Sequence, residues 1–67
     1  MSVARVTEIS ARSESSFEAA LNEAIERAHK TLRNVKSAWI KEQHVEVENG
    51  RIVAYRVNLL VTFVLDD

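Results

Sequence analysis

The dipeptide Asn49-Gly50 is the feature that most constrains the fold of this chain. It lies between two runs, Ser37 to Val47 and Ile52 to Leu65, whose side chains alternate with the period of two that is typical of strands. Asn-Gly favours a type I′ turn, whose twist matches that of two antiparallel strands. The sequence therefore predicts a β-hairpin with Asn49 and Gly50 at the centre of its turn.

A segment that begins at Ser15 has the pattern of one amphipathic helix. Ser15 precedes Glu18 by three positions, which is the spacing of a capping box. The acid Glu23 stands four residues before the base Arg27, the order that stabilises a helix. Apolar residues recur at helical spacing in one stripe: Phe17, Ala20, Leu21, Ala24, Ile25, Ala28 and Leu32. The sequence therefore predicts a helix that buries one of its faces.

The residues before this helix complete the order of elements. Val3 to Ser10 is rich in β-branched residues and precedes a serine-rich stretch, which predicts a short first strand. The order strand, helix, strand, strand over residues 1–67 predicts a single α+β domain (β-α-β-β) with a curved antiparallel sheet. The run from Ile52 to Leu65 would extend roughly 45 Å at about 3.3 Å per residue, more than one short helix covers. One face of the sheet is therefore expected to lack a partner within the chain.

The small size of the chain raises the question of what stabilises it. A domain of 67 residues buries only about 60% of the surface that its unfolded chain exposes. Small domains usually gain stability from disulfides, a metal or self-association. The chain contains no cysteine, so disulfides and thiolate metal sites are excluded. We therefore expect an oligomer of identical subunits.

Charge and hydropathy narrow the class of partner. The formal net charge is −1, from 9 basic and 10 acidic residues, which gives no reason to expect a nucleic acid or an anionic membrane. No apolar run is long enough to span a bilayer, and the start of the chain lacks the apolar segment of a signal peptide. We therefore expect a cytoplasmic protein.

Pairing residues outward from the turn assigns the two faces of the hairpin. One face of the third strand is wholly apolar or aromatic and is expected to pack on the helix: Val53, Tyr55, Val57, Leu59, Val61, Phe63 and Leu65. Opposite these residues, the second strand is expected to present Ala38, Ile40, Glu42 and His44. The other face is mixed, with Trp39 opposite Leu60 and Gln43 opposite Arg56. Trp39 is therefore expected to lie outside the core of the single chain.

Trp39, the only tryptophan, has two interpretations on this mixed face. An exposed aromatic rimmed by polar groups commonly marks a ligand or partner surface. As a ligand site, Ser37 and Trp39 project from one face about 7 Å apart along the strand. Gln43 and Arg56 would then hold a flat, anionic or carbonyl-bearing ring by hydrogen bonds. As packing, Trp39 fills a subunit interface, Arg56 forms a salt bridge there and Gln43 is solvated.

The whole chain resembles the dodecins. The resemblance rests on the order of elements, the length and three stretches: "ERAHKTLRNV" at the end of the helix, "ENGRIVAYRV" around the turn and "VTFVLDD" at the end of the chain. It implies a three-stranded antiparallel sheet wrapped around one helix, and a hollow homododecamer of cubic symmetry. It also implies binding of flavins such as riboflavin or FMN in pairs at two-fold interfaces, in a storage, sequestering or protective role without catalysis.

The chain departs from the family at the residues that hold the flavin. The family's stacking tryptophan aligns with Ser37, and its ring-binding glutamine aligns with Arg56. Arginines of the family align with His44 on the second strand and with Val64 near the end of the third. Some dodecins without the tryptophan and glutamine are regarded as non-flavin members, including calcium-associated ones. The resemblance therefore leaves two ligands open, a flavin and calcium.

These observations predict a binding protein and not an enzyme. The chain has no Ser/His/Asp arrangement, nucleophile elbow or phosphate loop. The function predicted first is an oligomer that binds or stores a flavin or a similar aromatic small molecule at its subunit interfaces. Its predicted ligand-binding residues are Ser37, Trp39, Gln43 and Arg56. The alternative is a shell without flavin that binds calcium or is purely structural, with Asp66, Asp67 and Glu48 as candidate ligands for a hard cation.

Overall fold

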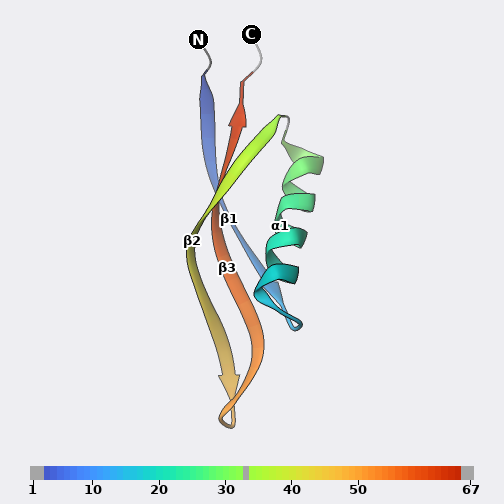
Figure 1. Ribbon diagram of the computed structural model, residues 1–67, viewed down its shortest axis with the longest axis vertical. Coiled ribbons are helices and arrows are strands. Elements are labelled where there is room, and N and C mark those ends of the chain that lie inside the picture. The colour runs from blue at the N-terminus through green and yellow to red at the C-terminus, as the bar shows by residue number, and fades with distance from the viewer. Residues whose placement is uncertain (1–2, 33, 66–67) are drawn as a thin grey trace.

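The computed structural model describes residues 3–32 and 34–65, and that part of the chain forms one helix and three strands (Figure 1). The elements are β1 (Ala4–Ser13), α1 (Phe17–Thr31), β2 (Val35–Glu48) and β3 (Arg51–Val64). The strands pair antiparallel in the order β1-β3-β2, so β3 is the central strand. The predicted α+β class and β-α-β-β order are confirmed. The first strand continues beyond its predicted end at Ser10.

The sheet is longer than the helix that packs on it. The chain measures 52 × 19 × 13 Å along its principal axes, whereas the 15 residues of α1 span about 22 Å. Figure 1 shows α1 on one side of the sheet and the β2–β3 hairpin continuing past the N-terminal end of the helix. We refer to the other side of the sheet as the helix-free face.

α1 begins one residue later than the predicted cap implies. The Ser16 hydroxyl accepts a hydrogen bond from the backbone N–H of Ala19 at 3.0 Å, so Ser16 is the N-cap. The predicted capping box at Ser15 is wrong, because the Ser15 backbone N–H donates to the Ser13 hydroxyl at 3.0 Å in the turn after β1. Glu18 lies in the first turn, where its charge complements the helix dipole.

The core forms where small residues of α1 meet branched residues of β3. The buried cluster consists of Ala20, Ala24 and Ala28 of α1 and Val57, Leu59 and Val61 of β3. The alanines recur every four residues, so their methyl groups lie on one face of the helix and let it approach the sheet closely. The predicted helix-facing side of the third strand is thereby confirmed at its three central positions.

The turn between β2 and β3 has the predicted conformation. Asn49 and Gly50 have φ angles of 51° and 74°, both in the left-handed region that a type I′ turn requires. Glu48 and Arg51 pair directly across the base of the turn. The predicted hairpin is confirmed at this end.

Gly50→Ala is expected to lower the free energy of unfolding by about 1–2 kcal/mol, because an L-residue is strained in the left-handed region. Steric clash adds nothing, since no heavy atom lies within 4 Å of an added Cβ. Urea denaturation followed by circular dichroism measures the difference. The control is Asn49→Gly, which keeps the turn conformation accessible and is expected to change the free energy by less than about 0.5 kcal/mol. Equal midpoints for Gly50→Ala and the unaltered chain would contradict this account of the turn.

Two β-bulges change the predicted register of the hairpin. β2 has an extra residue at Lys41 and β3 has one at Val53, so the pairing between these points is displaced by one residue. Gln43 therefore pairs with Val57, and the predicted pairing of Gln43 with Arg56 is wrong. Outside the two bulges the predicted pairs are confirmed: Ala38–Val61, Trp39–Leu60, Ile40–Leu59 and Val47–Ile52.

The displaced register exchanges side chains between the two faces of β2. Glu42 pairs with Asn58 and His44 pairs with Arg56. Directly paired residues share a face, and these two residues of β3 alternate with its buried ones. The predicted placement of Glu42 and His44 on the helix side is therefore wrong, because both lie on the helix-free face. Gln43 lies on the helix side between them.

Candidate functional site

The helix-free face is organised in rows of three side chains, one from each strand. The rows are Glu8, Leu60 and Trp39 (the tryptophan row), Ser10, Asn58 and Glu42 (the asparagine row), and Arg12, Arg56 and His44 (the arginine row). Successive rows lie two residues apart on β3, a separation of about 7 Å. A row with a large aromatic side chain therefore lies next to a polar row, which lies next to a basic one.

Trp39 is exposed in the middle of this face. Its side chain pairs with the half-buried Leu60, and 60% of its surface is accessible. Ser37 lies on the same face two residues earlier, about 7 Å along β2. The predicted placement of Trp39 outside the core is confirmed. An indole in this position is available to stack on a flat ring or to pack against another subunit.

Two polar pairs lie beside the indole of Trp39. Lys41 Nζ lies 3.1 Å from Glu8 Oε1, an ion pair that spans the central strand. Asn58 donates a hydrogen bond from Nδ2 to Glu42 Oε1 at 3.0 Å in the asparagine row. Sequence reasoning assigns Lys41 and Asn58 to this face but misses Glu8 and Glu42, because nothing in the alternation indicates that the bulge turns Glu42 to this face. The indole is therefore an apolar surface with hydrogen-bonding groups next to it.

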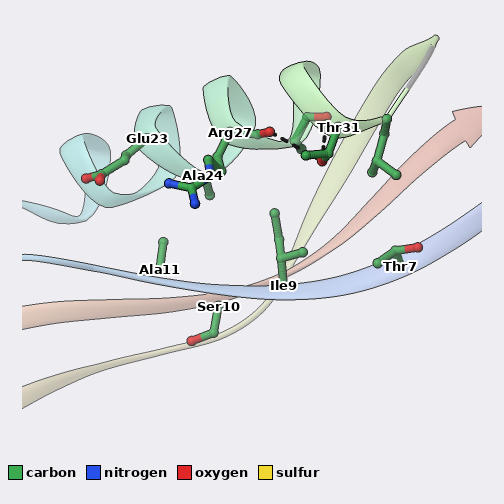
Figure 2. A pocket seen from close by; sticks show the side chains of 10 residues that line it. Thr7, Ile9, Ser10, Ala11, Glu23, Ala24, Arg27 and Thr31 are labelled. Atoms are coloured by element: carbon green, nitrogen blue, oxygen red, sulfur yellow. Dashed lines mark hydrogen bonds between the residues drawn. The ribbon is translucent and has the colours of Figure 1, made fainter.

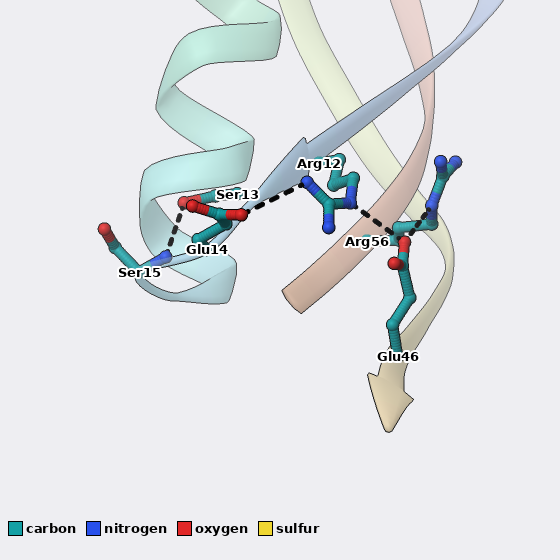
Figure 3. A network of polar contacts seen from close by, with 6 residues as sticks. All are labelled: Arg12, Ser13, Glu14, Ser15, Glu46 and Arg56. Carbon is teal, nitrogen blue, oxygen red and sulfur yellow. Dashed lines mark hydrogen bonds and ion pairs between the residues drawn. The ribbon is translucent and has the colours of Figure 1, made fainter. Parts of the chain in front are cut away.

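Arg56 is held in an ion-pair network with Glu46 and Arg12 (Figure 3). Glu46 Oε2 lies 2.6 Å from Arg56 Nε and 3.1 Å from Arg12 Nε. Arg12 also has Nη1 3.8 Å from a carboxylate oxygen of Glu14. On β3, Arg56 is four residues from Leu60, so about 13 Å separates the arginine row from the tryptophan row. Arg56 therefore shares the face of the indole without contacting it.

The network lowers the pKa of Glu46 below its ordinary value of 4.5. The largest cause is the hydrogen bond from Arg12, followed by the one from Arg56, since both favour the ionised carboxylate. The same hydrogen bond raises the pKa of Arg12. Because the pKa of Glu46 is lower in the folded chain, its contribution to stability is present above the ordinary pKa and is lost as the pH falls through the lowered one.

Glu46→Gln is expected to remove this pH-dependent contribution to stability. At pH 7 the variant is expected to unfold at a lower temperature than the unaltered chain. The difference is expected to disappear as the pH falls below 4.5 through the lowered pKa of Glu46. Thermal unfolding at a series of pH values measures it, and Glu14→Gln, a more exposed partner of Arg12, is the control with little expected effect. A difference for Glu46→Gln that stays constant down to pH 3 would contradict the assignment.

Gln43 lies apart from the predicted site. It pairs with Val57, which is buried against α1, so its side chain belongs to the helix side of the sheet. Of the four predicted ligand-binding residues, Ser37 and Trp39 are neighbours on the helix-free face. Arg56 lies further along that face, and Gln43 lies on the opposite one.

The described part of the chain has neither a metal centre nor a membrane-spanning helix. Residues 3–32 and 34–65 include no group of three or more His, Asp or Glu side chains placed to hold a metal ion. The candidate cation ligands Asp66 and Asp67 lie outside the described residues. The helix within those residues is too short and too polar to cross a bilayer.

Comparison with known proteins identifies relatives over nearly the full length of the chain. The family model described as Dodecin matches residues 3–66. A curated relative is the calcium dodecin of Mycobacterium tuberculosis, which is 35% identical over 63 residues. The match covers 94% of this chain and 89% of that protein.

Solved structures have the same fold. A single-residue mutant of the dodecin of Thermus thermophilus matches with a TM-score of 0.93 at 33% identity, with all of both chains covered. The dodecin of Streptomyces coelicolor matches with a TM-score of 0.91 at 27% identity, over 98% of this chain and 94% of that one. The calcium dodecin of M. tuberculosis, described as calcium-chelating, matches with a TM-score of 0.81 at 34% identity, over 96% and 91% of the two chains. This chain belongs to the dodecin family.

Proposed function

We propose that this protein is a self-assembling, non-catalytic dodecin that binds a flavin or a similar flat aromatic molecule between subunits. The observation that carries the proposal is Trp39, whose side chain is 60% exposed on the helix-free face. Stacking of a flat ring on an aromatic side chain contributes about 1–3 kcal/mol. Some members of the family bind flavins, which present such a ring.

The ring is expected to lie between two subunits, because one sheet face covers it from one side only. Ligand sites bury about 70–90% of the surface of a small molecule. A second copy with its helix-free face turned toward the first, related by a two-fold axis, supplies the missing side and a second Trp39. The same contact supplies the stability that a domain of 67 residues gains from self-association.

Polar groups for the edge of the ring come from the rows beside Trp39. In the same subunit, Ser37 and Asn58 lie about 7 Å away along the strands. A two-fold axis placed at the asparagine row would reverse the order of the rows and bring the partner subunit's Arg56 opposite Trp39. Arginine donates charge-assisted hydrogen bonds to a carbonyl or anionic group. The aromatic surface and the arginine would thus come from different subunits.

Calcium is the second candidate ligand, because the calcium dodecin of M. tuberculosis is 35% identical to this chain. Calcium takes about 6–8 oxygen ligands. Within the described residues, no three acidic or imidazole side chains form a group, and Glu42 and Glu46 accept hydrogen bonds from Asn58 and Arg56. A calcium site would therefore draw ligands from several subunits or from the terminal aspartates.

The absorbance spectrum of the protein as purified from cells tests the proposal. We expect the visible bands of a flavin, together with an assembly mass in native mass spectrometry that includes the ligand. A colourless protein that gains no such bands when riboflavin or FMN is added would contradict flavin binding. If that protein also binds calcium in titration calorimetry, calcium replaces the flavin as the proposed ligand. A monomeric mass would overturn the self-association on which both candidates depend.

A further inference from the structure

The side-chain amide of Asn58, in the row next to Trp39, has hydrogen-bonding groups left over. Asn58 is half-buried on β3 and donates from Nδ2 to Glu42 Oε1 at 3.0 Å. Because a carboxylate accepts hydrogen bonds, Glu42 holds the nitrogen end of the amide toward β2 and leaves the oxygen Oδ1 directed away from it. Within the described residues this is the only hydrogen bond of the Asn58 side chain. One N–H group and Oδ1 are therefore available to a ligand.

Lys41 adds a second donor on the β1 side of the same surface. Its Nζ lies 3.1 Å from Oε1 of Glu8, which belongs to β1, so the ammonium reaches across the central strand from β2. An ammonium has three N–H groups, and Glu8 is its only ion-pair partner in the described part of the chain. Across the sheet the available groups are therefore the Asn58 N–H, the Asn58 Oδ1 and the Lys41 ammonium, in the order donor, acceptor, donor.

This order is complementary to the edge of an imide, in which an N–H group lies between two carbonyl groups. A carboxamide forms two parallel hydrogen bonds with a neighbouring acceptor and donor on the edge of a flat ring, as Asn and Gln do with the edges of bases. The ammonium then donates to the second carbonyl. A ring with an amino group in place of that carbonyl would bring a donor against the ammonium and is disfavoured.

The polar row on the other side of Trp39 specifies no such order. Ser37 and Thr62 pair there across β2 and β3. The Thr62 hydroxyl oxygen is buried and has no hydrogen-bond partner within the described residues. Ser37 is exposed, but its hydroxyl rotates and both donates and accepts, so it does not distinguish one ring edge from another. Selection among rings is therefore expected on the side of Asn58.

We propose that Asn58 and Lys41 determine which flat rings bind, and that they select rings with an imide edge. An isoalloxazine is longer than an indole, so a ring that stacks on Trp39 extends to the asparagine row, about 7 Å away. Asn58 Nδ2 donates to one carbonyl of the ring, the imide N–H donates to Asn58 Oδ1, and Lys41 donates to the other carbonyl. The inference rests on the proposed function and names the class of ring that the site binds.

A groove between β1 and α1, on the opposite side of the sheet, offers a second concave surface to a ring (Figure 2). Its volume is about 410 Å³ and its lining includes no aromatic side chain. Glu23 and Arg27 line it without forming an ion pair with each other. Binding in this groove would depend on Arg27 and not on Asn58. Arg27→Gln is therefore a matched control for variants of the helix-free face.

Two forms of riboflavin test the selection, one unaltered and one with a methyl group on the imide nitrogen. The methyl group removes the central donor and meets Asn58 Oδ1, so the methylated form is expected to bind the unaltered protein at least about tenfold more weakly. Asn58→Leu retains the size of the side chain and removes both hydrogen-bonding groups. This variant is expected to bind the two forms within about threefold of each other. Titration of flavin fluorescence measures the affinities, and circular dichroism verifies folding.

Two further variants complete the test. Arg27→Gln is expected to retain the tenfold preference, whereas Lys41→Met is expected to bind unaltered riboflavin about threefold to tenfold more weakly. Equal affinities of the unaltered protein for the two forms, a preference that persists in Asn58→Leu, or an unchanged affinity in Lys41→Met would overturn the inference and leave the proposed function standing. Failure of the unaltered protein to bind either form would overturn the proposed function as well.

Discussion

Leu59→Ala is expected to lower the free energy of unfolding by about 2–5 kcal/mol. Leu59 has no exposed surface and lies in the cluster between β3 and the alanines of α1. Alanine methyl groups cannot extend into the space that the leucine vacates, so a cavity remains. Because small domains have a net stability of only about 5–15 kcal/mol, this side chain accounts for a large part of the stability of the fold.

Urea denaturation at one fixed protein concentration measures the effect of Leu59→Ala, since assembly makes the apparent stability depend on concentration. The matched control is Val3→Ala, because Val3 is 61% exposed at the start of the described chain. It is expected to change the free energy by less than about 0.5 kcal/mol. A loss as small as this for Leu59→Ala would contradict the packing of α1 on the centre of β3.

Trp39→Ala is expected to weaken riboflavin binding at least about tenfold while the assembly remains intact. Removal of a stacking surface loses about 1–3 kcal/mol, and each 1.4 kcal/mol is about tenfold in affinity. The indole is 60% exposed and lies outside the buried cluster, so the fold is expected to be unchanged. Fluorescence titration measures the affinity, and native mass spectrometry measures the assembly.

Two further variants distinguish the loss of ring stacking at Trp39 from a general effect of altering β2. Trp39→Phe keeps an aromatic ring and is expected to retain most of the affinity. Ile40→Ala changes the next residue, which is 51% exposed but directed to the other side of β2, and no loss of affinity is expected. Disassembly of Trp39→Ala would assign the indole to subunit packing, and an unchanged affinity would contradict stacking.

The turn and the helix follow from signals that are local in the sequence. Asn49 and Gly50 both adopt positive φ, as their residue types predict. The alanines of the apolar stripe are buried because helical spacing alone brings them to one face. The start of the helix is less certain from sequence, because Ser15 and Ser16 are adjacent and both have a hydroxyl that can cap. Only the structure distinguishes them.

The face of each residue on β2 is only partly predictable, because it depends on where the alternation breaks. Nothing marks Lys41 as the extra residue of a bulge, since no glycine or proline lies near it. One such residue moves Glu42 to the helix-free face and Gln43 off it. The bulge at Val53 on the opposite strand cancels the shift, so the register at Trp39 returns to the predicted one. The position of the indole is therefore predicted correctly, whereas Glu42 and Gln43 are assigned to the wrong faces.

The ion-pair network illustrates a second limit of sequence reasoning. Arg12 and Glu46 are 34 residues apart in the chain, and they meet only because β1 and β2 lie on either side of β3. Alternation within one strand specifies the face of a side chain but not the strand that lies beside it. The contact of Arg56 with Glu46 is also absent from the predicted register, because it spans the displaced part of the hairpin.

The central claim is that the helix-free face holds a flat aromatic ring on Trp39. Titration of riboflavin with the protein, followed by the fluorescence of the flavin, tests it most directly. The account predicts that fluorescence falls in proportion to the subunits added at micromolar concentration, because a flavin stacked on an indole is quenched. Fluorescence that stays at the level of free riboflavin throughout the titration would contradict the account.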